Sequence, residues 1–211
     1  MGSVSLLLLL LSGAPDPRQA LDPPQAPDPP AATTTNDSGA PITGIGRLNW
    51  TVHSTIGPAS LWIGVLSAGW GTAFNHPREY GESFVGFSKR YGLRLAGIAT
   101  DNTLEAGVGA FWGEDPRYHR ADSTRPRSRL GHVARMTFMA ENREGDEKLA
   151  YARYIGIGGG NALADLWRPD SERTASNTMI RIGEGFGGRF LCNLWDEFWP
   201  DLKGHMPWSK R

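Results

Sequence analysis

The sequence is poor in cysteine and carries no net charge, and each shortage excludes a class of protein. Its 211 residues include one cysteine, Cys192, so no disulfide forms within the chain and a zinc site would need histidine and carboxylate ligands. The 22 basic residues balance 22 acidic ones. Strongly basic proteins attract nucleic acid through a field that this chain lacks. We therefore expect no nucleic-acid partner.

The sequence also lacks the spacings typical of metal and nucleotide sites. No two of the five histidines are three or four residues apart, the spacing that places two imidazoles on one helix face. The GIGGGN run from Gly156 lacks the third glycine of a dinucleotide-binding loop and the lysine of a phosphate-binding loop. We expect no metal and no cofactor.

The first 45 residues offer little that could fill a core. Residues 1–14 contain an apolar run, Val4–Leu11, followed by small residues, which is typical of a signal peptide although the usual positive start is missing. The run is too short to cross a bilayer, and no cysteine lies near it to carry a lipid anchor. Residues 15–45 are proline-rich, so we predict a disordered segment. These features predict an exported protein of the periplasm or envelope.

Residues 46–202 show helical periodicity and form the predicted domain, with a tail at 203–211. Small residues recur every four positions in Leu149–Trp167, and aromatic and aliphatic residues do so in Thr174–Trp199, where Pro200 is expected to stop the helix. A shorter helix is predicted in Leu130–Asn142. In Glu79–Trp112 the pattern predicts a helix that Pro77 starts and Gly113 ends. Charged and small residues occupy opposite faces of this helix. The charged face has Arg90, Arg94, Asp101 and Glu105, and the small face has Gly92, Ala96, Thr103 and Ala110.

These patterns predict an all-α fold, a compact bundle of four to five glycine-rich helices packed through small residues. A membrane β-barrel is the alternative, because glycine alternates with larger residues in YIGIGGG and RIGEGFGG. The alternation ends within about six residues, whereas the four-residue stripes persist for longer, and this favours helix.

The segment Ile56–Asn75 is the candidate for membrane contact. No Lys, Arg, Asp or Glu occurs between Arg47 and Arg78. Twenty such residues are just long enough to cross a bilayer, but the stripe of Ser60, Gly64, Ala68 and Gly71 equally suits close packing in a soluble bundle. Membrane lipid and other envelope components are therefore the possible partners, and the oligomeric state is left open.

The segment EDPRYHR, from Glu114 to Arg120, holds the candidates for catalysis. Glu114 or Asp115 could form an acid and base pair with His119 in a turn between two helices. The competing interpretation is that Asp115 and Arg117 make local turn and capping interactions over helix ends.

The motifs EDPRYHR, LWRP and DEFWPD, separated by glycine-rich segments, resemble those of uncharacterised secreted or envelope proteins of acidobacteria-like bacteria, over about residues 56–202. The resemblance implies an envelope setting and no particular activity. We accordingly predict a non-enzymatic, membrane-associated helical bundle. The alternatives are a periplasmic hydrolase that uses the Glu114–His119 loop, and a glycan- or lipid-binding module with exposed tryptophans such as Trp70 or Trp112.

Overall fold

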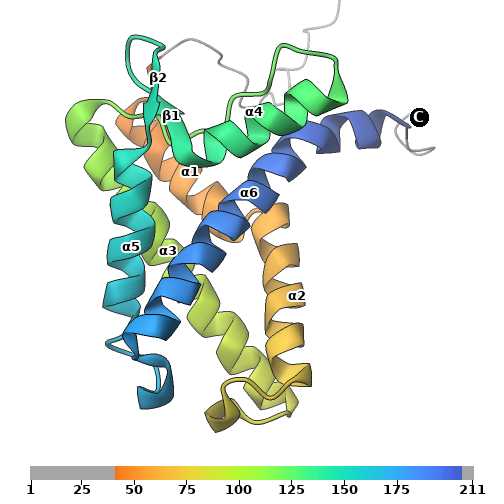
Figure 1. The fold of residues 1–211 in the computed structure, drawn as a ribbon, viewed down its shortest axis with the longest axis vertical. Coiled ribbons are helices and arrows are strands. Elements are labelled where there is room, and N and C mark those ends of the chain that lie inside the picture. Colours follow the sequence, from red (N-terminus) through yellow and green to blue (C-terminus); the bar gives the residue numbers. More distant parts are fainter. Residues whose placement is uncertain (1–40, 206–211) are drawn as a thin grey trace, which may run out of the picture. The chain divides into compact units, whose positions relative to one another are not determined.

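The computed structural model describes residues 41–205. The predicted leader at 1–14 and most of the predicted proline-rich segment lie outside the described residues. The predicted all-α class is confirmed for the part of the chain that the structure describes (Figure 1). Its elements are α1 (Gly44–Ile56), α2 (Pro58–Ala73), the 3-10 helix η2 (Arg78–Tyr80), α3 (Phe84–Trp112), α4 (Pro126–Phe138), β1 (Met139–Glu141), β2 (Glu147–Leu149), α5 (Tyr151–Ala164), the 3-10 helix η3 (Asp170–Glu172) and α6 (Ala175–His205).

Helices α1 and α2 are separated by a single residue. Thr43 caps α1, because its hydroxyl accepts a hydrogen bond from Gly46 N at 3.0 Å. Gly57 ends α1 in an extended conformation, and Pro58 occupies the first position of α2, where its missing N–H costs no hydrogen bond. The chain thus bends at Gly57 and continues as a second helix.

Helix α3 ends where the sequence predicts and begins later. Gly113 terminates it in the left-handed conformation, with φ of 78°. The predicted start at Pro77 is wrong: Pro77 precedes η2, Gly81 adopts φ of 73°, and Ser83 then caps α3 by accepting a hydrogen bond from Gly86 N. The left-handed glycine and the serine cap move the helix start by seven residues relative to Pro77.

The helix predicted at Leu130–Asn142 is displaced toward the N-terminus. Helix α4 spans Pro126–Phe138, and the next three residues form β1, which pairs antiparallel with β2. The side chain of Asn142 accepts hydrogen bonds from Glu144 N and Asp146 N, and Gly145 has φ of 83°. This turn reverses the chain and forms a hairpin in place of the last helical turn.

Both glycine-rich segments that could have been strands are helical, in α5 and α6. The prediction that Pro200 ends the last helix is wrong, since α6 continues through it to His205 and includes the first residues of the predicted tail. Beyond the proline, Asp201 forms ion pairs with Arg120 and Arg129. These ion pairs attach the last turns of α6 to Arg120 and Arg129, and they offset the loss of the backbone hydrogen bond that proline cannot donate.

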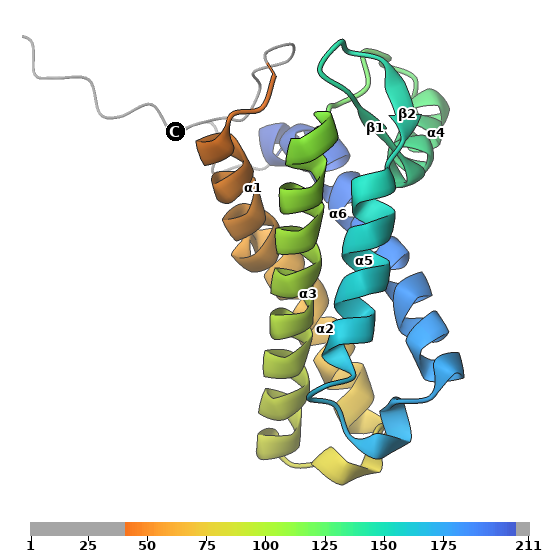
Figure 2. The same cartoon turned by 90° about the vertical axis from the view of Figure 1, so that its left-hand side faces the viewer.

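Helix α3 is central to the bundle and contacts α1, α2 and α5, while α6 crosses it and packs against α2, α4 and α5 (Figures 1 and 2). Small residues mediate two of these contacts, as predicted. Ser60, Gly64 and Ala68 are buried on α2. The stripe on α5 is buried as well, and consists of Ala152, Gly156, Gly160 and Ala164.

On α3 and α6 the small residues that pack are not the expected ones, since Gly109 and Gly185 lie against α5. The small face of α3 is mainly exposed, at Gly92, Ala96, Thr103 and Ala110. Gly183 and Gly187 on α6 are also exposed, and a Cβ on either would meet open space. The charged face of α3 points inward instead, with Arg90 7% exposed and Glu105 2% exposed. Glu105 pairs with arginines of α5 and α6, and Arg90 donates hydrogen bonds to backbone carbonyls, which makes their burial possible.

Candidate functional site

The interior of the bundle is unusually polar. Fourteen polar or charged residues are buried among the described residues, against nine apolar ones. Only three of the nine are larger than alanine: Val133, Met136 and Ile157. Burial of apolar area is normally the main term that stabilises a fold. The apolar surface of this chain must therefore lie elsewhere, and the position of that surface is the first clue to function.

The centre of the interior is an ion-pair cluster around Glu105. Its Oε1 accepts a hydrogen bond from Arg153 Nε at 3.0 Å, and its other oxygen pairs with Arg189. Arg153 also donates to three carbonyls at the end of α4 and the start of β1, with Met136 O at 2.6 Å. The cluster joins α3, α4, α5 and α6. Removing one partner from such a buried pair typically costs about 3–5 kcal/mol.

A second cluster surrounds Glu197, whose side chain is fully buried on α6. Its carboxylate accepts hydrogen bonds from Tyr118 Oη at 2.9 Å, Ala121 N at 3.1 Å and Arg129 Nε. Burial alone would raise the pKa of Glu197, but these donors outweigh it, so the pKa lies below its usual value. The cluster holds the 113–125 loop and α4 against α6.

Asp101 lies at the contact between α3 and α5. The absence of a side chain at Gly160 makes room for it, because a Cβ there would overlap Asp101 Oδ1. This oxygen is buried and has no hydrogen-bond partner among the described residues. Burial, and to a smaller extent the negative charge of Glu105, raises the pKa of Asp101 from 3.8 to about 7. Asp101 is the one carboxyl of the interior whose charged form the surroundings disfavour this strongly among the described residues.

The predicted catalytic residues each have a structural partner. Glu114 Oε2 accepts hydrogen bonds from Ala152 N at 3.0 Å and Trp112 Nε1 at 3.1 Å, so it caps the start of α5. Asp115 forms a two-pronged ion pair with Arg117. The Asp115 contact is the turn interaction that the sequence offered as the competing interpretation.

His119 pairs with a different residue. Its Nδ1 lies 2.8 Å from Glu141 Oε2, and its carbonyl oxygen lies 2.9 Å from His132 Nε2. No hydrogen bond joins His119 to Glu114 or Asp115 within residues 41–205. The structure therefore does not bring the three predicted residues together as one acid and base pair, and the catalytic hypothesis stays a prediction. Within the same range, no group of three metal-binding side chains lies close enough to hold a metal ion.

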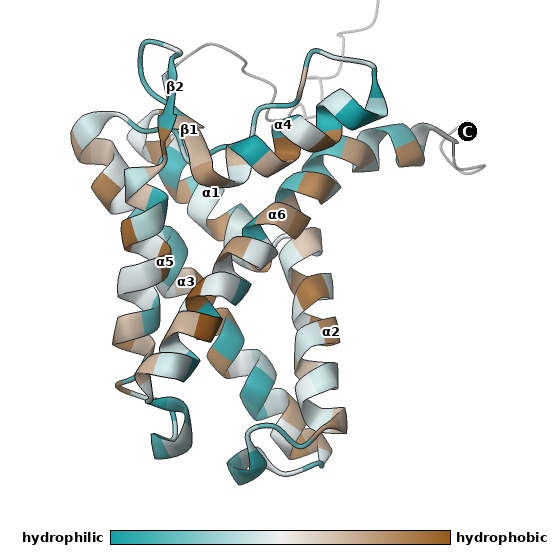
Figure 3. Cartoon of the chain, in the orientation of Figure 1, coloured by the Kyte–Doolittle hydropathy of each residue, from teal (hydrophilic) through white to brown (hydrophobic). Residues whose placement is uncertain are grey.

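Many large apolar side chains are exposed, and every α-helix carries some of them. Figure 3 shows hydrophobic residues along each of the α-helices. Helices α1 and α2, which follow each other with one residue between them, together carry eight of the exposed large apolar side chains. On each of these helices the side toward α3 is polar or small, with Arg47, Thr55 and Ser60 buried. The opposite side forms what we call the α1–α2 apolar face, which consists of Ile45, Leu48, Val52, Ile56, Trp62, Val65, Leu66 and Trp70.

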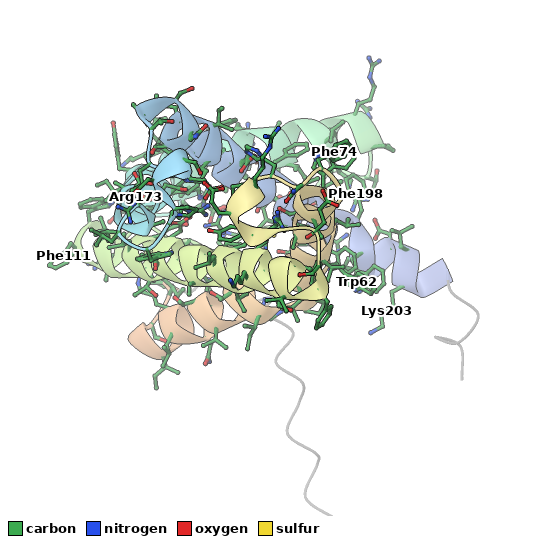
Figure 4. All side chains as sticks on the ribbon, turned by 90° about the horizontal axis from the view of Figure 1, so that it is seen from below. Trp62, Phe74, Phe111, Arg173, Phe198 and Lys203 are labelled. Atoms are coloured by element: carbon green, nitrogen blue, oxygen red, sulfur yellow. The ribbon has the colours of Figure 1, made fainter. Side chains whose placement is uncertain are left out.

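Polar contacts hold this orientation of α1. Arg47 Nη2 donates to the carbonyl oxygen of Glu114 at 2.8 Å, and Asn102 Nδ2 donates to Thr55 Oγ1 at 3.1 Å. Trp62 is consequently 61% exposed and Leu66 71% exposed. Figure 4 shows Trp62, together with Phe74 and Phe111 from neighbouring elements, which are exposed to a similar or greater extent. No described helix is both long enough and apolar enough to cross a membrane.

Sequence reasoning missed the two ion-pair clusters. One signal was available, since Arg153 is the only charged residue of α5 and stands within its small-residue stripe. A lone arginine between small residues on a packing face needs a buried carboxylate. The identity of that carboxylate could not be read from the sequence, because Glu105 is 48 residues away.

Three comparisons with known proteins add no relative. No family model matches the chain, and neither the curated proteins nor the solved structures contain a significant match. The motif-level resemblance to secreted or envelope proteins of acidobacteria-like bacteria stays a prediction, and no family is assigned to the chain.

Proposed function

We propose that this protein is a non-enzymatic, membrane-associated helical domain that rests on a lipid surface through the α1–α2 apolar face. The observation that carries the proposal is the inverted polarity of α1 and α2. Arg47, Thr55 and Ser60 are buried against the body of the protein, while the aliphatic and tryptophan side chains of both helices are exposed. If the predicted leader acts as a signal peptide, the surface belongs to the cell envelope.

The size of the face supports lipid contact. Each of its eight side chains is at least 40% exposed. Full burial of a large apolar side chain gains about 1.5–3 kcal/mol, so covering the part still exposed gains roughly 1 kcal/mol per side chain. Contiguous apolar patches of this kind are uncommon on proteins that remain free in water. The gain is sufficient for interfacial binding of an amphipathic helix.

The composition of the face favours a bilayer over a protein partner. Trp62 and Trp70 are of the type that concentrates at membrane interfaces, where an apolar ring carries a polar N–H. Because residues 48–77 contain no Lys, Arg, Asp or Glu, binding should depend little on lipid charge.

Vesicle flotation of the full chain tests the proposal. We expect the wild type to float with vesicles of zwitterionic phosphatidylcholine, and a Trp62→Glu, Leu66→Glu variant to lose at least tenfold in partitioning, which is about 1.4 kcal/mol. The matched control is Leu130→Glu, Phe138→Glu on α4, which places the same two charges at exposed apolar residues of another helix.

The same variants test whether the α1–α2 apolar face binds a second copy of the chain instead of lipid. Light scattering without lipid would then show a concentration-dependent dimer that the Trp62→Glu, Leu66→Glu variant abolishes. Such a dimer, combined with failure of the wild type to float, overturns the proposal. Equal flotation of all three proteins overturns the role of the α1–α2 apolar face.

A further inference from the structure

A cavity of about 1030 Å³ lies between α2, α3 and α6, with part of α5 in its wall. This volume is at the upper end of the range of about 300–1,000 Å³ found for small-molecule sites. Its lining combines apolar side chains with five arginines. It includes Trp70 of the α1–α2 apolar face, but neither Trp62 nor Leu66, the two residues that the vesicle experiment changes.

Buried polar atoms without partners concentrate around this cavity. Seven side-chain nitrogen or oxygen atoms are buried without a hydrogen bond among the described residues. Five of them belong to residues that line the cavity: Ser60, Tyr80, Asp101, Arg168 and Arg181. Buried polar groups are nearly always satisfied in native proteins, so exceptions gathered at one place need an explanation. The five atoms mark the cavity wall as a region where buried polar groups lack partners within residues 41–205.

Arg94 stands out among the five arginines of the cavity wall. Arg168, Arg181 and Arg189 each form an ion pair with a carboxylate. Arg90 donates to backbone carbonyls around the α2–α3 turn, with Gly81 O at 2.7 Å and Pro77 O at 2.8 Å. These four guanidinium groups are already committed to partners within the protein.

The guanidinium of Arg94 has one acceptor, the carbonyl oxygen of Ser60 at 3.2 Å, and no carboxylate partner among the described residues. Gly64 leaves room for it against α2, since a Cβ there would lie 2.9 Å from Arg94 Nη1. Burial lowers the pKa of Arg94, but an arginine stays charged at any physiological pH. A half-buried positive charge of this kind favours an anion.

The surroundings of Arg94 define the class of anion. Ile63, Leu93 and Ile98 line the cavity beside it, so an apolar chain can extend from the bound charge. The carboxylates of Glu105 and Glu184 line the same cavity and disfavour a second negative charge. A ligand with one negative charge and an apolar chain fits both the apolar wall and the nearby carboxylates.

We propose that the cavity binds a long-chain carboxylate, with its head group on Arg94 and its chain along the apolar wall. Arg94 is the ligand-binding residue of this site. The inference stands on the cavity and Arg94, and it does not depend on the membrane association proposed above.

Isothermal titration of the full chain with dodecanoate, below its micellar concentration and without vesicles, tests the site. We expect saturable one-to-one binding, and at least tenfold weaker binding of dodecanol, which has the same chain and no charge. Arg94→Gln should weaken dodecanoate binding at least tenfold, and Arg94→Lys less. The matched control, Arg127→Gln at an exposed position of α4, should bind like the wild type.

Other outcomes overturn the proposal. Equal affinity for dodecanol and dodecanoate removes the role of the charge, and tighter binding of dodecyl phosphate than of dodecanoate overturns the single-charge assignment. If Arg94→Gln fails to fold, Ile98→Trp fills the cavity instead, and unchanged dodecanoate binding by that variant rejects the site. Dodecanoate binding should survive Trp62→Glu, Leu66→Glu, and vesicle flotation should survive Arg94→Gln, so the two proposals fail independently.

Discussion

Replacing Gly156 with alanine should destabilise the fold, because α3 approaches α5 most closely at this point. A Cβ on Gly156 would lie 2.8 Å from the carbonyl oxygen of Asp101 and 3.0 Å from Cβ of Glu105. These atoms belong to, or are attached directly to, the backbone of α3, so they cannot rotate away and the helices must separate. Overpacking of this kind costs about 1–3 kcal/mol.

Gly158 on the same helix provides a matched control, since a Cβ there meets open space. Alanine in a helix is favoured over glycine by about 1 kcal/mol, and both variants receive this gain. We therefore expect Gly158→Ala to be slightly more stable than the wild type, and Gly156→Ala to be about 1–3 kcal/mol less stable than Gly158→Ala.

Urea denaturation followed by circular dichroism at 222 nm measures the two free energies of unfolding. The Tm gives a second reading, because 1 kcal/mol shifts Tm by about 2–4 °C in a domain of this size. Equal stability of Gly156→Ala and Gly158→Ala would refute the close contact of α3 and α5 on which the packing argument rests.

Two further predictions concern buried carboxyls, and one concerns the cap of α5. The pKa of Asp101 is raised from 3.8 to about 7, so the folded state loses stability as pH rises between these values. Asp101→Asn should abolish that loss and be more stable than the wild type at pH 8 by up to about 4 kcal/mol, with little difference at pH 4. Urea titrations at both pH values measure the difference. The pKa of Glu197 is lowered in the folded state, so its carboxylate stabilises the fold above the unfolded pKa near 4.5, and this stabilisation is lost as pH falls through the folded-state pKa. Glu197→Gln should therefore lower the free energy of unfolding by about 3–5 kcal/mol at pH 7 and by less in acid. Glu114→Ala should lower the free energy of unfolding by about 1 kcal/mol or more through loss of the α5 cap, and a variant as stable as the wild type would contradict the capping role.

Local chemistry in the sequence was sufficient to predict most of the helices. Periodicity located α2, α3, α5 and α6, and Gly113 ended α3 as expected from its freedom to adopt a left-handed conformation. The stripes on α2 and α5 correctly predicted packing through small residues. The turn contact of Asp115 with Arg117 also required only local reasoning, whereas the helix that Glu114 caps begins 37 residues later.

Which face of each helix points inward was decided by the tertiary structure. Periodicity shows that Arg90, Arg94, Asp101 and Glu105 share one face of α3, but a charged face can be buried only if hydrogen-bonding or oppositely charged partners meet it. Those partners come from distant positions, and Arg189 lies 84 residues from Glu105. The sequence thus determined the helices and their faces. The polar interior, the α1–α2 apolar face and the cavity beside Arg94 exist only because long-range ion pairs turned the charged faces inward and left the apolar ones outside.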